Sequence, residues 1–161
     1  MKAATAIHVP ELSAANLDEI QRIRIHLEGE AAAMAAERIT KLELAKLERI
    51  QADFHNAAAV DSREAAIQNR LFHFALISAA RAPLILATVG NMWVMMGPLL
   101  RRFHEEMPPR ELGSRDHKHF EVLDGLRERN PEKTRQAIQA DIKWGRVMID
   151  WVERKAESLS A

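Results

Sequence analysis

Apolar residues recur at intervals of three and four positions along almost the whole chain, which is the period that places them on one face of an α-helix. No segment shows the sustained alternation between turns that is typical of a β-hairpin. The sequence therefore predicts an all-α fold. Helix starts are indicated by capping side chains three positions before an acidic residue, or by a proline suited to a first turn, at Asn16, Thr40, Asp61, Pro83 and Pro131.

The helices that this pattern predicts cover residues 16–39, 41–59, 62–80, 83–106, 115–129 and 131–157. The clearest break is the segment MPPRELGS, after which Ser114 is expected to cap the fifth helix. Because the connections are short, neighbouring helices should pack antiparallel. A length of 161 residues suits one domain. We therefore expect an antiparallel bundle of about six helices over residues 16–157, with a lead-in over residues 1–15 and a tail over residues 158–161.

The charges of the chain balance, because Lys and Arg total 23 and Asp and Glu also total 23. A chain without net charge is not expected to hold nucleic acid or anionic lipid over a broad surface. The absence of Cys excludes a disulfide scaffold, a thiolate metal site and a cysteine nucleophile. The N-terminal residues lack the apolar core and cleavage signature of a secretory signal, so a cytoplasmic location is expected.

One stretch, Ala82–Leu100, contains no charged residue and is nearly long enough to cross a bilayer. Its prolines, glycines, threonine and asparagine lower its hydrophobicity. The rest of the chain has the amphipathic pattern of a soluble bundle. We therefore expect this stretch to form a buried central helix and not a membrane span.

Polar side chains on apolar helix faces are informative, because burying a polar group without a partner is costly. Such side chains come from the third, fifth and last predicted helices: Asn69, His73, His119 and Asp141. Their convergence would bring together two imidazoles, a carboxylate and an amide oxygen, a donor set that suits a first-row divalent ion. Two alternatives stay open: each imidazole can bond to a backbone carbonyl or an acid, and His73 can pair with Asp141.

The other histidines carry less weight. His117 aligns with acidic residues of the predicted fifth helix and is expected to face solvent. Outer positions are also expected for His8, His26 and His55, and the position of His104 stays ambiguous.

Arg24 lies in register with apolar residues of the first predicted helix. It can pair with Glu28 four positions later, or it can hold a ligand carboxylate in a bidentate fork. Both interpretations stay open. The side chains of Met92, Trp93, Met95, Met96 and Phe103 can line a pocket, although such a stripe is more typical of core.

Three segments of the chain resemble the FCD domain, the C-terminal effector domain of FadR-type members of the GntR regulators. The first is Arg24 and Glu28 followed by AAAMAAERIT. The second, NRLFHFALISAARAPLI, is similar to the family's Asp or Asn, then Phe-His, then a small-residue turn with proline. The third, HFEVLDGLRERNPEKTRQAIQADI, has the family's His, a short turn and a metal-binding position 22 residues after that His.

The resemblance implies an internal pocket that holds a divalent metal and a small organic acid or similar metabolite. Asn69 takes the position of the family's Asp or Asn, and His73 and His119 match two ligand histidines. Asp141 stands where the family usually has a third His, a departure that bears on metal preference and affinity. With a neutral Asn69, Asp141 returns one negative charge to the set. Zinc is the first expectation, with nickel, manganese and iron also allowed.

The function implied is that of a homodimerising, ligand-sensing domain without catalysis, in which an acid bound by the metal and Arg24 shifts the packing of the bundle. The family places a winged helix-turn-helix before this domain, and residues 1–15 are too few to form one. DNA contact is therefore expected only through a domain outside this chain. The rival hypotheses are a metal-dependent enzyme acting on a small hydroxy or carboxylic acid, and a membrane or purely structural helical protein.

Overall fold

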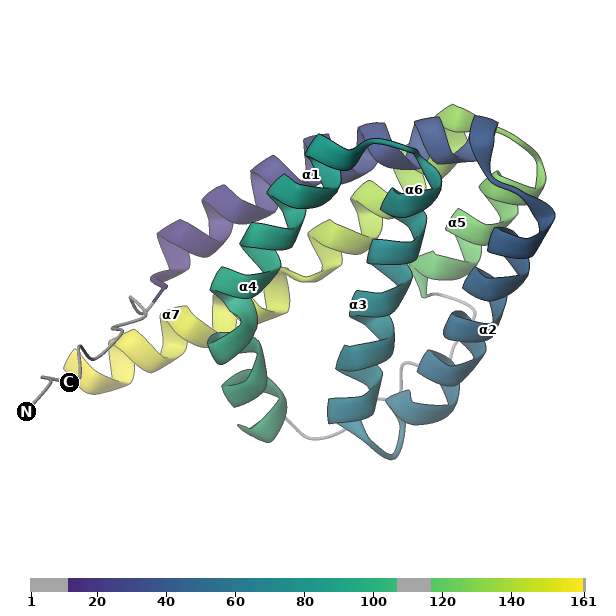
Figure 1. Cartoon of the computed structure of the whole chain (residues 1–161). Coiled ribbons are helices and arrows are strands. Elements are labelled where there is room, and N and C mark those ends of the chain that lie inside the picture. The colour runs from purple at the N-terminus through teal and green to yellow at the C-terminus, as the bar shows by residue number, and fades with distance from the viewer. Residues whose placement is uncertain (1–11, 107–116, 161) are drawn as a thin grey trace, which may run out of the picture.

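The structure, a computed structural model, describes residues 12–106 and 117–160 (Figure 1). It confirms the all-α fold, because every element in the described residues is a helix and the helices pack into one bundle. The elements are α1 (Ala14–Arg38), α2 (Lys41–Ala58), α3 (Ser62–Ala79), α4 (Pro83–Glu106), α5 (Lys118–Arg127), α6 (Pro131–Trp144) and α7 (Arg146–Ser160).

The helix predicted over residues 131–157 is divided in two at Gly145. The Gly145 N–H donates to the Ile142 carbonyl at 3.1 Å, a tighter turn than that of an α-helix, and α7 begins at the next residue. The side chain of Gln21, from α1, donates to the same carbonyl at 2.8 Å. The apolar periodicity continues across this break, so the sequence pattern alone does not reveal it.

The helix starts follow the predicted capping residues with two exceptions, at α1 and α5. Thr40 and Asp61 cap α2 and α3 as predicted. The prediction for α1 was wrong, because Ser13 is the cap and Asn16 is the third helical residue that completes a capping box with it. The predicted fifth helix is observed as Lys118–Arg127. Its cap is His117 and not the expected Ser114, which lies outside the described residues.

The buried core is formed where α1, α3 and α6 pack against their neighbouring helices. The alanine-rich segment of α1 packs along α6, and α3 lies against α1, α2 and α4 (Figure 1). Ala31, Ala32, Ala35 and Ala36 are fully buried, and their small side chains let the neighbouring helices approach α1 closely. As a result, polar residues of α1, α3, α5 and α6 meet in the interior.

Helix α4, which contains the uncharged stretch, is not the buried central helix that we expected. Only 17% of its most apolar window is buried, and Leu84, Val94 and Met95 are exposed. Among the described residues it is the one helix long and apolar enough to cross a membrane, with a mean hydropathy of 1.5. Its inner face nevertheless packs into the bundle core through Trp93 and Phe103. The prediction failed because an uncharged stretch need not be enclosed within its own chain.

Candidate metal centre

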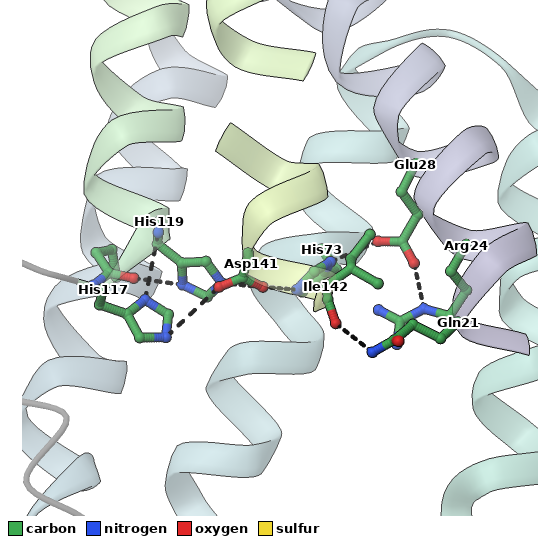
Figure 2. A network of polar contacts seen from close by, with 9 residues as sticks. Gln21, Arg24, Glu28, His73, His117, His119, Asp141 and Ile142 are labelled. Carbon is green, nitrogen blue, oxygen red and sulfur yellow. Dashed lines mark hydrogen bonds and ion pairs between the residues drawn. The ribbon is translucent and has the colours of Figure 1, made fainter. Parts of the chain in front are cut away.

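Asp141, on the last turns of α6, lies among three imidazoles in the interior of the bundle (Figure 2). Its Oδ2 is 3.1 Å from Nε2 of His73 on α3 and 3.7 Å from Nε2 of His119 on α5. The ligand atoms of His73, His119 and Asp141 all lie within 4.8 Å of one another. The structure therefore brings together three of the four residues that the sequence analysis selected as ligands.

His73 is held between two carboxylates. Its Nδ1 is 2.6 Å from Oε2 of Glu28, and its Nε2 faces Asp141. Burial opposes a charge on the ring, yet Glu28 and Asp141 together raise the pKa of His73 to about 9. Without a metal, the charged ring therefore pairs with both acids. One open alternative of the sequence analysis, a His73–Asp141 pair, is thus present.

Glu28 was not selected as a site residue, and the structure places it between Arg24 and His73 in this series of contacts. It is fully buried on α1, where Oε1 accepts from Nε of Arg24 at 2.5 Å. Burial opposes its ionisation, but Arg24 and His73 lower the pKa of Glu28 to about 2. Burial likewise opposes the charge of Asp141, while His119 and His73 hold the pKa of Asp141 well below its usual range.

His119 offers a buried ring nitrogen, Nε2, that makes no hydrogen bond with the part of the chain that the structure describes. Its ring stacks on Phe72 with centroids 3.9 Å apart, and Nδ1 lies 2.7 Å from Oε1 of Gln51. Nε2 is buried and makes no hydrogen bond within the described residues. Burial lowers the pKa of His119, so the ring is held in the neutral form that binds metals. An orphaned nitrogen aimed at a carboxylate fits a metal ligand.

His117 was predicted from the sequence to lie on a solvated face, and this prediction was wrong. His117 is 9% exposed, and its Nε2 is 3.8 Å from Oδ1 of Asp141. The error arose because α5 begins at Lys118, three residues later than predicted, so His117 is the helix cap and does not follow the helical wheel. Burial and the nearby His119 lower the pKa of His117 to about 4.

Asn69 stays a predicted ligand that the structure does not test. It is half-buried on α3, one turn before His73, and it lines the same cavity. Its side chain hydrogen-bonds to none of the described residues. The amide is therefore free to turn toward the cavity.

A cavity of about 630 Å³ opens beside the cluster. Its walls are mostly apolar and include Trp93, Met96 and Phe103, whereas Met95 of the same predicted stripe is exposed. The polar lining includes His73, His117 and Asp141, which therefore face a space large enough for a small metabolite.

Arg24 lies at the edge of this cavity and combines the two interpretations left open by the sequence. Its Nε pairs with Glu28, and its guanidinium carbon lies 4.6 Å from the centroid of the Trp93 ring. The same side chain also lines the cavity. The pair with Glu28 is thus present, and contact with a ligand stays a prediction.

Two of the residues that the sequence analysis missed carried a signal in the pattern. Gln51 shares a helix face with Leu47, Phe54 and Ala58, and it is 2% exposed. Its spacing therefore predicts a buried amide. Glu28 lies next to the alanine-rich buried face of α1 but was considered only as the partner of Arg24. For His117 no periodicity could help, because it lies before the helix.

Known proteins match this chain in sequence and in fold. The FCD domain family matches residues 19–143. The HTH-type transcriptional regulator McbR of Escherichia coli K12 is 33% identical over 136 residues, which cover 84% of this chain and 62% of McbR. The chain thus spans about three fifths of that relative.

Two solved structures share the fold of this chain. E. coli McbR/YncC superimposes with a TM-score of 0.84 at 29% identity, over 94% of this chain and 76% of that one. A Streptococcus agalactiae GntR structure has a TM-score of 0.64 at 19% identity, over 79% and 56% of the two chains, and supports the fold alone. From its sequence match and its helical architecture, the chain belongs to the FCD domain family.

Proposed function

We propose that this chain is the effector-binding domain of a GntR-type transcription regulator, and that it holds a divalent metal and a small carboxylate-bearing effector. The observation that carries the metal is the buried Nε2 of His119, which has no hydrogen bond among the described residues and lies 3.7 Å from Oδ2 of Asp141. Nε2 of His73, Nε2 of His119 and Oδ2 of Asp141 would hold the ion. Asn69 is the proposed fourth donor.

The donor set fits zinc first. Two imidazoles and one carboxylate are ligands common to zinc, nickel, manganese and iron, and no thiolate is present to favour a softer ion. Such an ion would act as a Lewis acid with open positions that a ligand carboxylate can occupy. The protein's own residues orient the site: Glu28 fixes Nδ1 of His73, and Gln51 contacts Nδ1 of His119.

The metal is tested by loading purified protein with Zn²⁺, dialysing it and measuring bound zinc by mass spectrometry, with thermal unfolding in parallel. We expect about one zinc per chain and a stabilisation of roughly 2.7 kcal/mol at a free concentration 100 times the Kd. His73→Ala should lose both effects. His26→Ala, at an exposed position of α1, is the matched control and should keep them. A wild-type protein that binds no divalent metal would contradict the proposed centre.

The effector is proposed to be an acid with an apolar body, which agrees with the mostly apolar cavity walls and the guanidinium at their edge. A carboxylate held by Arg24 would compete with Glu28 for the guanidinium, and Glu28 contacts His73. Binding of the acid is thereby linked to the geometry of the metal centre. This link is a route by which a ligand can shift the packing of α1 against α3.

Calorimetry of Zn²⁺-loaded protein with aliphatic monocarboxylates from butyrate to octanoate tests the role of Arg24. A charge-assisted hydrogen bond contributes about 1.5–3 kcal/mol, so Arg24→Gln should weaken binding by roughly 10-fold or more. Arg22→Gln is the control, because Arg22 is exposed and pairs with Asp18 outside the cavity. Equal affinities of the two variants would remove Arg24 from the effector site.

DNA binding, homodimerisation and a cytoplasmic location complete the proposal. McbR is named as a helix-turn-helix regulator and is longer than this chain, which supports DNA contact through a separate winged helix-turn-helix domain. We propose no catalytic step. His117, buried beside Asp141, adds a base to the site, so the geometry fits an enzyme as well as a sensor. The support for a sensor over an enzyme comes from the named regulator relative.

A further inference from the structure

His117 occupies a position for which the family resemblance gives no role. It is the cap residue of α5, two positions before His119, and it is buried against the rings of the site. Its ring centroid lies 4.6 Å from that of Phe54 and 4.3 Å from that of His119. The ring is therefore fixed in place, and its two nitrogens face different partners.

The backbone at the start of α5 determines where the proton of His117 lies. The His119 backbone N–H donates to Nδ1 of His117 at 3.4 Å. A peptide N–H can only donate, so Nδ1 must be the nitrogen without a proton. The proton of the His117 ring consequently lies on Nε2.

His73 shows the opposite arrangement. Its Nδ1 is 2.6 Å from a carboxylate oxygen of Glu28, which can only accept, so Nδ1 carries a proton. This leaves Nε2 of His73 as the nitrogen available to a metal. Both histidines thus face Asp141 through Nε2, but the contacts of their Nδ1 atoms differ. Nδ1 of His73 donates, so its Nε2 can release its proton when a metal binds, whereas Nδ1 of His117 accepts, so its Nε2 keeps its proton.

The two carboxylate oxygens of Asp141 face different ring nitrogens. Nε2 of His73 and Nε2 of His119 lie near Oδ2, at 3.1 and 3.7 Å. Nε2 of His117 lies near Oδ1, at 3.8 Å. This last separation exceeds a hydrogen bond by about 1 Å or less, which a small rotation of the carboxylate can close.

Building on the proposed metal centre, we propose that His117 is a positioning residue and not a metal ligand. Its Nε2–H donates to Oδ1 of Asp141, so that Oδ2 is the single oxygen presented to the metal together with His73 and His119. Partners of this kind outside the ligand set typically change metal affinity by 10–100-fold. Asp141 replaces the family's third His, and a carboxylate has two oxygens where an imidazole presents one nitrogen. His117, at the start of α5, holds the oxygen that does not face the metal.

The proton position is tested in metal-free protein, independently of any metal binding. Long-range ¹H–¹⁵N spectra of the histidine side chains distinguish the two neutral tautomers, and His117→Gln assigns the His117 signals. We expect His117 to carry its proton on Nε2. A proton on Nδ1 would overturn the proposal whether or not the protein binds zinc.

The positioning role is tested by Zn²⁺ affinity, measured by competition with a chromophoric chelator. His117→Gln places an amide N–H near the position of Nε2, and we expect it to keep an affinity close to that of the wild type. His117→Leu removes the donor and should lower the affinity by roughly 10–100-fold. Circular dichroism checks that both variants fold.

The comparison between these two variants decides the role. If His117→Gln loses as much affinity as His117→Leu, the ring itself is required and His117 is a ligand, which overturns the proposal. His119→Gln is the reference for loss of a ligand, and it should bind zinc far more weakly than His117→Gln. Failure of the wild type to bind zinc would instead contradict the proposed metal centre, and the spectra would still report the His117 tautomer.

Discussion

At the scale of single residues, the site contains a row of buried charged side chains, each of which contacts a neighbour of opposite charge. The row begins with Arg24 and Glu28 on α1, continues through His73 on α3 and ends at Asp141 on α6 (Figure 2). Buried charges are tolerated only when each one has a partner, because desolvation otherwise dominates. Glu28 lies between two cations and is therefore the residue on which the row most depends.

Glu28→Gln removes the one carboxylate that contacts both Arg24 and His73. Loss of one partner from a buried ion pair typically costs about 3–5 kcal/mol, and we expect a loss of this size in the free energy of unfolding. Urea denaturation of metal-free protein, followed by circular dichroism, measures it.

Glu30→Gln is the matched control for this change. Glu30 lies two positions further along α1, and its side chain is 53% exposed in a pair with Arg135. Surface pairs contribute about 0–1 kcal/mol, so this variant should unfold nearly like the wild type. Similar losses for the two variants would show that the buried row does not stabilise the fold.

At the scale of the elements, the close approach of α5 and α6 sets where His119 and Asp141 meet. A Cβ at Gly125 would lie 2.9 Å from the backbone N and 3.0 Å from the Cα of Thr134, on α6. Backbone atoms cannot move aside as a side-chain end can. A glycine on α5 is therefore required for the two helices to bring their site residues together.

Gly125→Ala should push α5 away from α6 and lower stability by about 1–3 kcal/mol, despite the better helix propensity of alanine. Thermal unfolding measures this effect, and Zn²⁺ affinity should fall with it because His119 moves relative to Asp141.

Gly90→Ala gives the opposite expectation in α4. There a Cβ would lie 3.8 Å from the Phe74 ring, an ordinary contact. Stability should rise by roughly 0.5–1 kcal/mol, because alanine replaces glycine inside a helix. If both alanine variants are stabilised, the α5–α6 approach is not as close as described.

At the scale of the whole molecule, the outer face of α4 is the feature that the chain does not explain by itself. Leu84, Val94 and Met95 are 81%, 68% and 48% exposed. No charged residue lies between Ala82 and Leu100 to keep this surface in water. A second copy of the chain, which brings the same uncharged face, is the occupant we propose for the homodimer.

Val94→Asp places a charge at the centre of this face and should convert a dimer to a monomer in sedimentation velocity experiments. Val60→Asp is the control, because Val60 is 77% exposed in the turn between α2 and α3. It should leave the dimer intact. A Val94→Asp protein that still sediments as a dimer would show that copies associate through another surface.

The sequence by itself determined the helical class, most helix boundaries and the inward direction of His73, His119 and Asp141. These depend on periodicity and capping, which act over a few residues along the chain. Arg24 was also identified from the sequence. Its spacing alone could not distinguish a pair with Glu28 from contact with a ligand.

Only the tertiary structure decided the roles of Glu28, Gln51 and His117. Glu28 belongs to the site because α1 faces α3 across the core, and Gln51 because α2 faces α5. His117 is buried because α5 begins after it, and α4 is exposed because no other described helix covers its outer face. Contacts between distant segments depend on how the elements pack, and a one-dimensional pattern carries no record of which faces meet.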